Sequence, residues 1–192
     1  FAYEYNGYWK DVGTLGSYWE ANMELIDIIP EFNLYEEYWK IYTKSDVIPP
    51  QYIADDAEIE RSIIGEGTEV YGKVINSVIG SGVTIEKGAV VRDSIVMQGT
   101  HIGACTVVDK AIIAENVTIG ANAEVGFGDY APSTYDPKVY QFELATIGEN
   151  SVIPDGVKIG RNTAIAGETA IDDYPDGILA GGNYIIKAGG VK

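Results

Sequence analysis

The sequence predicts a mainly β protein whose larger part is a parallel β-helix, and three observations support this. From residue 53 onward, Ile or Val recurs about every six residues. The residue two positions before each of these anchors is small or β-branched, with one exception, and glycine often follows the anchor. Such a pattern is expected of short strands and corners that close a three-sided coil, with successive coils stacked about 4.8 Å apart.

The repeat has eighteen anchors, all Ile or Val, and its usual step is six residues. Steps of five occur three times, and one step of nine and one of 22 interrupt the series. At three anchors per coil, this number predicts six coils. The anchors are Ile53, Ile59, Ile64, Val70, Ile79, Ile85, Val91, Val96, Ile102, Val108, Ile113, Ile119, Val125, Ile147, Ile153, Ile159, Ile165 and Ile171.

The positions around the anchors fit a coil interior. Gln51, two positions before Ile53, is the only residue at that position relative to an anchor that is neither small nor β-branched. We expect the small residues to fit where the chain turns inward, and the glycines to supply backbone freedom near the corner. Glycine follows the anchor at Gly65, Gly80, Gly103, Gly120, Gly126, Gly148 and Gly160.

Two further segments belong to the predicted β-helix domain, residues 51–192. Residues 127–146 interrupt the repeat with an aromatic-rich loop, which is either a tolerated excursion or a functional segment, with subunit contact as the favoured role. Residues 174–192 contain a Pro-Asp-Gly turn and the apolar run 184–186, and we expect them to cap the end of the coil.

The first 50 residues predict a different kind of structure. Alternating aromatic residues predict a strand over residues 1–10. Apolar spacing predicts a helix over 15–29, with Thr14 or Ser17 as its N-cap, Pro30 at its end and a second short helix over 31–45. Pro49-Pro50 marks the boundary with the β-helix. Because the chain begins with Phe in the middle of a pattern, we expect it to be part of a longer protein.

The composition excludes several classes of function. Thirteen basic and 29 acidic residues give a net charge of −16, which disfavours binding to nucleic acid or to an acidic membrane surface. No apolar run approaches a membrane span, and no secretory signal is present. The single cysteine, Cys105, forms no intrachain disulfide, so we expect a cytoplasmic protein.

The repeat resembles the hexapeptide left-handed β-helix family, and the left hand is implied by that resemblance alone. Acyltransferases and trimeric carbonic anhydrases of this family use histidines, but this chain has only His101, which directly precedes an anchor and is expected to point outward. One His and one Cys are too few ligands to close a zinc site, and Cys105, in mid-coil, is interpreted as a small apolar filler rather than a nucleophile. A free-standing acyltransferase is therefore the weakest alternative.

A second resemblance concerns the amino-terminal segment. Residues 7–14 read Gly-Tyr-Trp-Lys-Asp-Val-Gly-Thr, and residues 18–25 read Tyr-Trp-Glu-Ala-Asn-Met-Glu-Leu. Both stretches, followed by a β-helix, closely resemble the bacterial glucose-1-phosphate adenylyltransferases (ADP-glucose pyrophosphorylases). Residues 147–157 look like clostridial-type members of that family. The resemblance covers nearly the whole chain and places it at the end of the nucleotidyltransferase domain plus the β-helix.

This resemblance implies a reaction and a metal. The family transfers the adenylyl group of ATP to glucose 1-phosphate, releasing pyrophosphate and making ADP-glucose for glycogen, with Mg²⁺ neutralising the developing charge. In related enzymes the Asp of this motif is one of two Mg²⁺ carboxylates, and Asp11 matches it. The alternative role for Asp11, which spacing alone favours, is to stabilise the turn at residues 11–13. The other catalytic groups would lie outside this chain, so we expect the fragment alone to be inactive.

The resemblance also implies tetramers regulated by anions near the junction of the two domains. Anionic effectors need Lys or Arg, and the candidates are Arg61, Lys73, Arg92, Lys158, Arg161 and Lys187. Glu115 stands where enterobacterial members carry an effector-binding Arg, which disfavours an AMP site of that type. Trp9, Tyr18 and Trp19 are either a sugar-stacking platform or packing between the two domains, and packing is favoured.

Two other functions remain open from the sequence. One is another sugar-1-phosphate nucleotidyltransferase, such as a mannose-1-phosphate guanylyltransferase. The other is a non-catalytic regulatory subunit that pairs with an active sister chain. The nucleotide preference of the intact protein distinguishes the first from the adenylyltransferase, and the intact Asp11 argues against the second.

Overall fold

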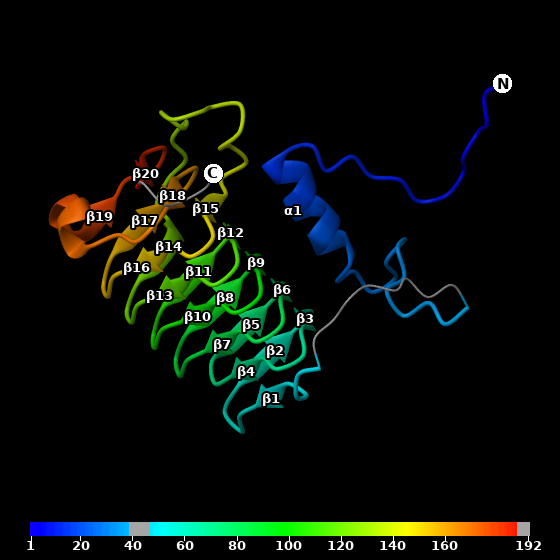
Figure 1. Ribbon diagram of the computed structural model, residues 1–192, viewed down its shortest axis with the longest axis horizontal. Helices are drawn as coiled ribbons and strands as arrows, with labels where there is room; N and C mark the ends of the chain where they lie inside the picture. Colours follow the sequence, from blue (N-terminus) through cyan, green and yellow to red (C-terminus); the bar gives the residue numbers. More distant parts are fainter. Residues whose placement is uncertain (39–46, 188–192) are drawn as a thin grey trace.

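The computed structural model describes residues 1–38 and 47–187, and most of them form a parallel β-solenoid. Short strands line three sheets that run the length of the solenoid (Figure 1). One sheet contains β1 (Tyr52–Ile53), β4 (Glu69–Val70), β7 (Thr84–Ile85), β10 (His101–Ile102), β13 (Thr118–Ile119) and β16 (Val152–Ile153).

The second sheet contains β2 (Glu58–Glu60), β5 (Lys73–Ile75), β8 (Val90–Arg92), β11 (Val107–Asp109), β14 (Glu124–Phe127), β17 (Lys158–Gly160) and β19 (Ile178–Leu179). The third contains β3 (Ile63–Ile64), β6 (Val78–Ile79), β9 (Ile95–Val96), β12 (Ala111–Ile113), β15 (Ala145–Ile147), β18 (Ala164–Ala166) and β20 (Tyr184–Ile186). Sheets of six, seven and seven strands make the solenoid longer than the six coils that eighteen anchors predict.

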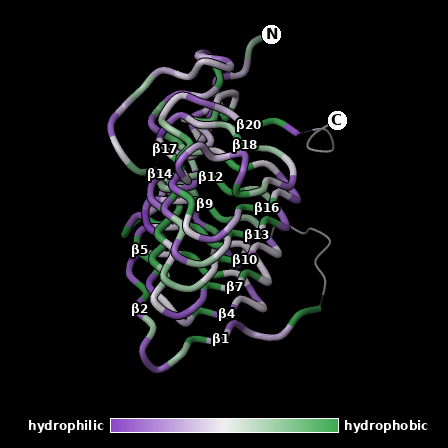
Figure 2. Tube along the Cα trace, turned by 90° about the vertical axis from the view of Figure 1, so that its left-hand side faces the viewer, coloured by the Kyte–Doolittle hydropathy of each residue, from purple (hydrophilic) through white to green (hydrophobic). Residues whose placement is uncertain are grey.

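The predicted parallel β-helix is confirmed by the strand register. From β1 to β15, each strand pairs in parallel with the strand three places later, so anchors of successive coils lie directly above one another, as Ile85, Ile102, Ile119 and Ile153 do. These four side chains are at most 1% exposed. Figure 2 shows the hydrophobic positions recurring along the stacked coils. The core is therefore a set of continuous columns, and each coil buries its neighbours.

The small residues before the anchors do more than save space, because several of them hydrogen-bond between coils. The Ser94 hydroxyl donates to the Arg92 carbonyl at 2.6 Å and accepts from the Ala111 N–H at 3.0 Å. Ser77 makes the same kind of link, accepting from the Ser94 N–H at 3.2 Å. Buried Ser and Thr at these positions thus satisfy backbone groups that would otherwise be unpaired at the corners.

Of the seven glycines after the anchors, only Gly126 uses the predicted backbone freedom, with a φ of 86°, and the others have a different role. A Cβ placed on Gly65 would lie 2.6 Å from the carbonyl carbon of Gly80, and one on Gly103 would lie 2.5 Å from that of Gly120. Close approach of neighbouring coils, rather than a positive φ, requires glycine at these two positions. Most left-handed corners lie elsewhere; they are occupied by Gly, Asn and a few other residues, as at Gly99, Asn116 and Cys105.

Two anchor assignments need correction. Val74 lies inside the step of nine and is fully buried, so the coil is not interrupted there. Ile171, predicted as the last anchor, is 53% exposed in the 3-10 helix Ile171–Asp173. Tyr174 and Leu179 fill the core instead, on either side of a second 3-10 segment, Pro175–Gly177. The chain departs from the period here, so counting by six selects the wrong side chain.

The predicted cap partly continues the solenoid. β19 pairs with β17, and β20 pairs with β18, so both extend existing sheets. Tyr174 is 3% exposed, its hydroxyl lies 2.8 Å from the Thr169 hydroxyl, and burial raises its pKa to about 12. The described part of the cap therefore ends the core with one buried tyrosine and two further strands.

The amino-terminal segment differs from its prediction in two places. The strand predicted over residues 1–10 is not formed, because no described strand lies beside it to complete a hydrogen-bonded ladder. The described part of the predicted second helix, residues 31–38, is not helical, and its remainder lies outside the described residues. The first helix forms as α1 (Leu15–Glu24), shorter than the predicted 15–29.

Candidate functional site

Asp11 lies in an exposed turn that leads directly into α1. The Gly13 N–H donates to the Asp11 carboxylate at 3.0 Å, which is the turn-stabilising role expected from spacing alone. Thr14 then caps α1, because its hydroxyl accepts from the Ser17 N–H and the Ser17 hydroxyl accepts from the Thr14 N–H, each at 3.1 Å. The reciprocal capping box fixes where the turn ends and the helix begins.

The described residues do not by themselves complete a metal site at Asp11. Among residues 1–38 and 47–187, no cluster of three or more His, Cys, Asp or Glu side chains has a geometry that could hold a metal ion. Mg²⁺ in proteins is held by about one or two carboxylates together with phosphates and water. An exposed carboxylate supported by one backbone N–H therefore fits one such ligand and no more.

The residues beside Asp11 are tied to α1. Lys10 donates to Glu24 at 2.5 Å and lies 3.7 Å from Glu20, one helical turn earlier. The Tyr8 hydroxyl also donates to Glu24, at 3.3 Å. The hydrogen bond to Glu24 raises the pKa of Lys10 by favouring its charged form. Glu24 thus holds the chain on the amino-terminal side of Asp11 against the helix.

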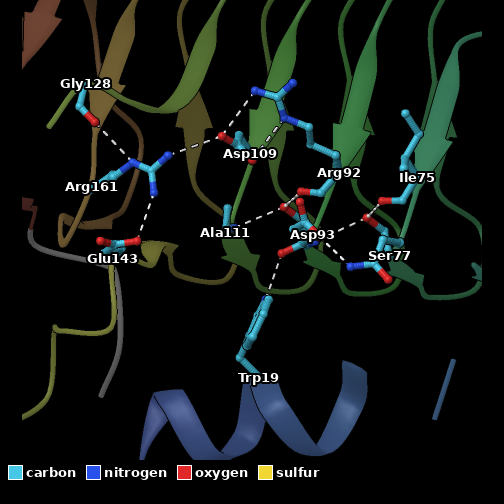
Figure 3. A network of polar contacts seen from close by, with 12 residues as sticks. Trp19, Ile75, Ser77, Arg92, Asp93, Asp109, Ala111, Gly128, Glu143 and Arg161 are labelled. Carbon is cyan, nitrogen blue, oxygen red and sulfur yellow. Dashed lines mark hydrogen bonds and ion pairs between the residues drawn. The ribbon is translucent and has the colours of Figure 1, made fainter. Parts of the chain in front are cut away.

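The helix in turn is docked on the solenoid. Apolar side chains of α1 (Leu15, Tyr18, Trp19 and Met23) pack on a cluster formed by Ile95, Ile112 and Leu144. The Trp19 indole N–H donates to the Asp93 carbonyl at 2.7 Å (Figure 3). The Lys110 ammonium lies 5.9 Å from the centroid of the Trp19 ring. The packing interpretation therefore holds for Tyr18 and Trp19, while Trp9 is 76% exposed and does not share it.

A charge network extends from this docking site across the neighbouring corner of the solenoid (Figure 3). Arg161 contacts Glu143 at 3.2 Å and Asp109 at 3.4 Å, and it also donates to the Gly128 carbonyl at 3.1 Å. Lys110 pairs with Glu143 at 2.8 Å, and this hydrogen bond is the main reason that the pKa of Glu143 is lowered. The network links the loop between β14 and β15 to the corner that holds Trp19.

Each of the six basic effector candidates is already paired with a carboxylate. The pairs are Arg61–Asp27, Lys73–Glu58, Arg92–Asp109, Lys158–Glu124, Arg161 with Asp109 and Glu143, and Lys187–Asp173. The six are spread along the solenoid on different strands and corners, and an anion would have to displace a carboxylate at each. The geometry therefore singles out none of them as an effector residue.

The remaining sequence candidates have structural roles on the surface. His101 on β10 points outward as predicted, and its Nε2 is 3.9 Å from Glu86. Cys105 is exposed at a left-handed corner with φ of 58°, so its interpretation as an interior filler was wrong. Glu115 is half-buried, and its carbonyl accepts from the Asn150 N–H.

The role of the loop became visible only in three dimensions. Segment 128–144 leaves the coil between β14 and β15, within the predicted range 127–146. Its Leu144 is 1% exposed and joins the cluster beneath α1, and its Phe142 ring packs so closely on Gly16 that a Cβ there would lie 2.6 Å away. The aromatic composition marked this loop, but no sequence signal identified α1 as its partner.

Comparison with known proteins agrees with this geometry. Residues 49–135 match the sequence family described as "GlmU-like, C-terminal hexapeptide". The chain is 70% identical over 98% of its length to a glucose-1-phosphate adenylyltransferase of Lachnospira eligens. Over the aligned residues the chain is thus closely similar to a protein of that name. Enzymes of the same name from Acetivibrio thermocellus and Thermotoga maritima are 41% and 46% identical over 98% and 97% of the chain.

The match covers only part of each relative. The chain spans 45% of the Lachnospira eligens protein and 44% of each of the other two, in their carboxyl-terminal part. The resemblance noted from residues 7–14 and 18–25 is thus confirmed at the level of whole-chain similarity. Among the described residues, no helix has the length and apolar character that crossing a bilayer requires.

Proposed function

We propose that this chain forms the carboxyl-terminal part of a glucose-1-phosphate adenylyltransferase. The intact enzyme would transfer the adenylyl group of ATP to glucose 1-phosphate, release pyrophosphate and act in the cytoplasm in glycogen biosynthesis. The observation that carries the proposal is the 70% identity to the Lachnospira eligens enzyme over 98% of the chain. The structure adds that the Asp11 turn is held at a fixed place by a docked helix, as a rim of an active site requires.

Within this proposal, Asp11 supplies one carboxylate ligand to Mg²⁺. When bound, Mg²⁺ neutralises charge that develops on the transferring phosphates. The residues of this chain contribute position: the Gly13 N–H orients the Asp11 carboxylate, and Glu24 holds Lys10 beside it. Trp19 fixes the helix to the solenoid through Asp93. The 192-residue chain alone is expected to show no turnover, since a single carboxylate does not make the site.

We also assign to the β-helix the roles of oligomerisation and regulation, with a tetramer, of one kind of chain or of paired sister chains, as the expected assembly. Exposed apolar side chains at the first coil support an interface there: Tyr52 is 54% and Ile53 is 40% exposed, although Ile53 belongs to an inward-facing column. A solenoid end that leaves core positions in water is stabilised by covering them.

The test uses the full-length protein that carries this chain. Initial rates are measured with glucose 1-phosphate and Mg²⁺ against ATP, GTP, UTP and TTP, for the wild type, Asp11→Asn and Asp27→Asn. Asp11→Asn keeps an oxygen that can accept the Gly13 N–H, so it preserves the turn and removes only the charge. We expect ATP preference and a loss of about 100- to 1,000-fold in Asp11→Asn. The control Asp27→Asn changes an exposed carboxylate on the same segment and should retain activity.

The other outcomes decide between the alternatives. Preference for another nucleotide, such as GTP, would assign the chain to a different sugar-1-phosphate nucleotidyltransferase. No activity with any nucleotide, from a folded oligomer, would favour a regulatory subunit. Full activity of Asp11→Asn would mean that the Asp11 carboxylate does not bind the metal and only stabilises the turn at residues 11–13.

A further inference from the structure

The second sheet of the solenoid has a long outer face on which its strands lie side by side (Figure 1). The residues on either side of the buried Val74, Val91 and Val108 point outward on this face, because side chains alternate across a strand. The helix α1 packs on the third sheet and leaves the second sheet open, so that Lys73 and Arg92 are exposed. The face is therefore accessible to a partner.

One outward column on this face has charges that are inverted when the column is read backward. Its first and last residues carry opposite charges, its second and fifth residues also carry opposite charges, and its two central residues are valines. From β2 to β17 the paired positions of the column are Glu58, Lys73, Val90, Val107, Glu124 and Lys158.

The neighbouring outward column has the same property at its centre. Arg92 on β8 pairs in register with Asp109 on β11, so opposite charges again flank the midpoint between these two strands. On one side of this pair β5 carries Ile75, and on the other side β14 carries Phe127. Both apolar side chains are half-buried. The two columns therefore share one midpoint, which lies between β8 and β11.

A second copy of the chain fits this pattern when its solenoid lies antiparallel on the face. The operation is a two-fold rotation about an axis that runs along the strands, between β8 and β11. Such an interface is isologous, so each contact occurs twice. The facing pairs are Glu58 with Lys158, Lys73 with Glu124, Val90 with Val107, and Arg92 with Asp109.

A shift of the axis by half a strand spacing destroys this match. With the axis on β8, Arg92 would face its own copy and Glu58 would face Glu124. With the axis on β11, Asp109 would face its own copy and Lys73 would face Lys158. Like charges across an interface exclude both arrangements. The matching column of the first sheet has one carboxylate and no Lys or Arg, so it contains no such pattern.

The charges on this face already form pairs within the chain. Lys73 lies 2.7 Å from Glu58, and Lys158 lies 2.9 Å from Glu124. In the antiparallel arrangement these two pairs face each other in opposite directions, which makes a square of alternating charges. Removing charged groups from water is costly unless each keeps an opposite neighbour. The face thus meets this condition when it is covered by its own copy.

The relief of the face fits the same arrangement. A hollow of about 200 Å³ lies over β11 and β14, and its lining includes Val107, Gly126 and Phe127. The two-fold rotation places β8 and β5 of the second copy over these strands. It therefore brings the apolar Ile75 side chain of one copy toward the Phe127 ring of the other. Apolar contacts of this kind supply affinity, while the charges set the register.

We propose that the outer face of the second sheet is an interface with a second copy of this chain, in which the two solenoids lie face to face and antiparallel. The proposal deepens the assembly role assigned to the β-helix and rests on it, but it uses a surface other than the first coil. A tetramer built from isologous contacts needs two such surfaces. Five strand spacings of about 4.8 Å make the face short, so we expect this contact to be reversible.

The test is sedimentation velocity of the full-length protein over a range of concentrations. Lys73→Glu and Glu124→Lys each put like charges across the interface at two places, and each should weaken association about 10- to 100-fold. An equal mixture of the two variants restores opposite charges at both places, so it should assemble like the wild type. Lys138→Glu makes the same charge change at an exposed position of the loop 128–144 and should have no effect.

The remaining outcomes separate this interface from the assembly role in general. Thermal unfolding first checks that each variant folds. Wild-type assembly in both single variants would overturn this interface and leave the assembly role intact. Loss of assembly in both variants without recovery in the mixture would overturn the antiparallel register, because the charges would then act within one chain. A wild type that stays monomeric at every concentration would overturn the assembly role and this interface together.

Discussion

The solenoid and the amino-terminal segment use apolar side chains in opposite ways. In the solenoid the inward columns are almost completely buried, as at Ile113 and Val125, which are both 0% exposed. In residues 1–38, equally large side chains lie in water, with Ile28 at 92% and Tyr3 at 89% exposure. Only α1 turns an apolar face onto another element, the cluster of Ile95, Ile112 and Leu144.

This difference shows that a repeat supplies its own packing partner and a single segment does not. Each coil buries the coil before it, so the pattern in the sequence is also the pattern of contacts. The amino-terminal segment has no such neighbour, and its order depends on docking to a particular surface. Residues that join the two regions, such as Trp19 and Phe142, are therefore the most informative places to perturb.

The largest expected effect compares the same substitution in the two regions. Ile113→Ala removes a fully buried side chain from an inward column and should lower the free energy of unfolding by about 2–5 kcal/mol. Ile28→Ala changes a side chain that is 92% exposed and should stay within about 0.5 kcal/mol of the wild type. Chemical denaturation of both variants measures the difference. Similar losses would mean that Ile28 is packed in solution and that the contrast is false.

A smaller effect tests the junction between the regions: the change in the stability of α1 docking caused by Gly16→Ala should reverse its sign between two backgrounds. Gly16→Ala should raise helix propensity by about 1 kcal/mol but places a Cβ 2.6 Å from the Phe142 ring, and such overpacking costs about 1–3 kcal/mol. We therefore expect Gly16→Ala to destabilise docking of α1 in the wild type and to stabilise it in Phe142→Ala. Hydrogen exchange of the α1 amides in this double-mutant cycle reports the coupling. Additive effects would show that the loop does not pack on the helix.

The smallest effect concerns pH and the ion pair beside this junction. The pKa of Glu143 is lowered from its usual 4.5 chiefly by its hydrogen bond to Lys110. A carboxylate whose folded pKa is depressed stabilises the fold above its unfolded pKa, and this contribution disappears as pH falls through the folded value. The stability difference between the wild type and Glu143→Gln should therefore be fully present above about pH 4.5 and be lost as pH falls further, through the depressed folded pKa.

Salt provides the control for this prediction. The pair is partly exposed, so high ionic strength should shrink the difference between the wild type and Glu143→Gln at neutral pH. A difference that persists at acid pH would mean that Glu143 acts by packing and not by charge. In that case the loop would be held to the corner at Glu143 by packing, as it is at Leu144.

Much of the fold was predictable because it is periodic. The six-residue step placed seventeen of the eighteen anchors on β-strands, and only Ile171 was assigned wrongly. Val74 was missed because it comes four residues after Val70, out of step with the period. The glycines and small residues were located correctly, but their reasons, close approach of coils and hydrogen bonds between them, needed coordinates.

The candidate site was less predictable. The Asp11 motif was visible as a motif, and the turn around it follows from local spacing. Local rules gave Thr14 or Ser17 as the N-cap of α1, and the structure has Thr14 in that position. The strand expected over residues 1–10 did not form, since alternation alone cannot supply a neighbouring strand. The partners of Trp19 and Phe142 lie far away in the sequence, so no local pattern identified them.

The sequence by itself determined the solenoid, its inward columns, the capped start of the helix and the kinship of the chain. These features depend on residues that are close together in the sequence: the six-residue repeat, the capping residues and the short motifs shared with relatives. Only the tertiary structure decided that α1 docks on Ile95 and Ile112, that the loop packs on Gly16, and that the buried Thr146 hydroxyl has no hydrogen-bond partner. Such contacts join residues that are distant in the chain, and their energies depend on which surfaces meet.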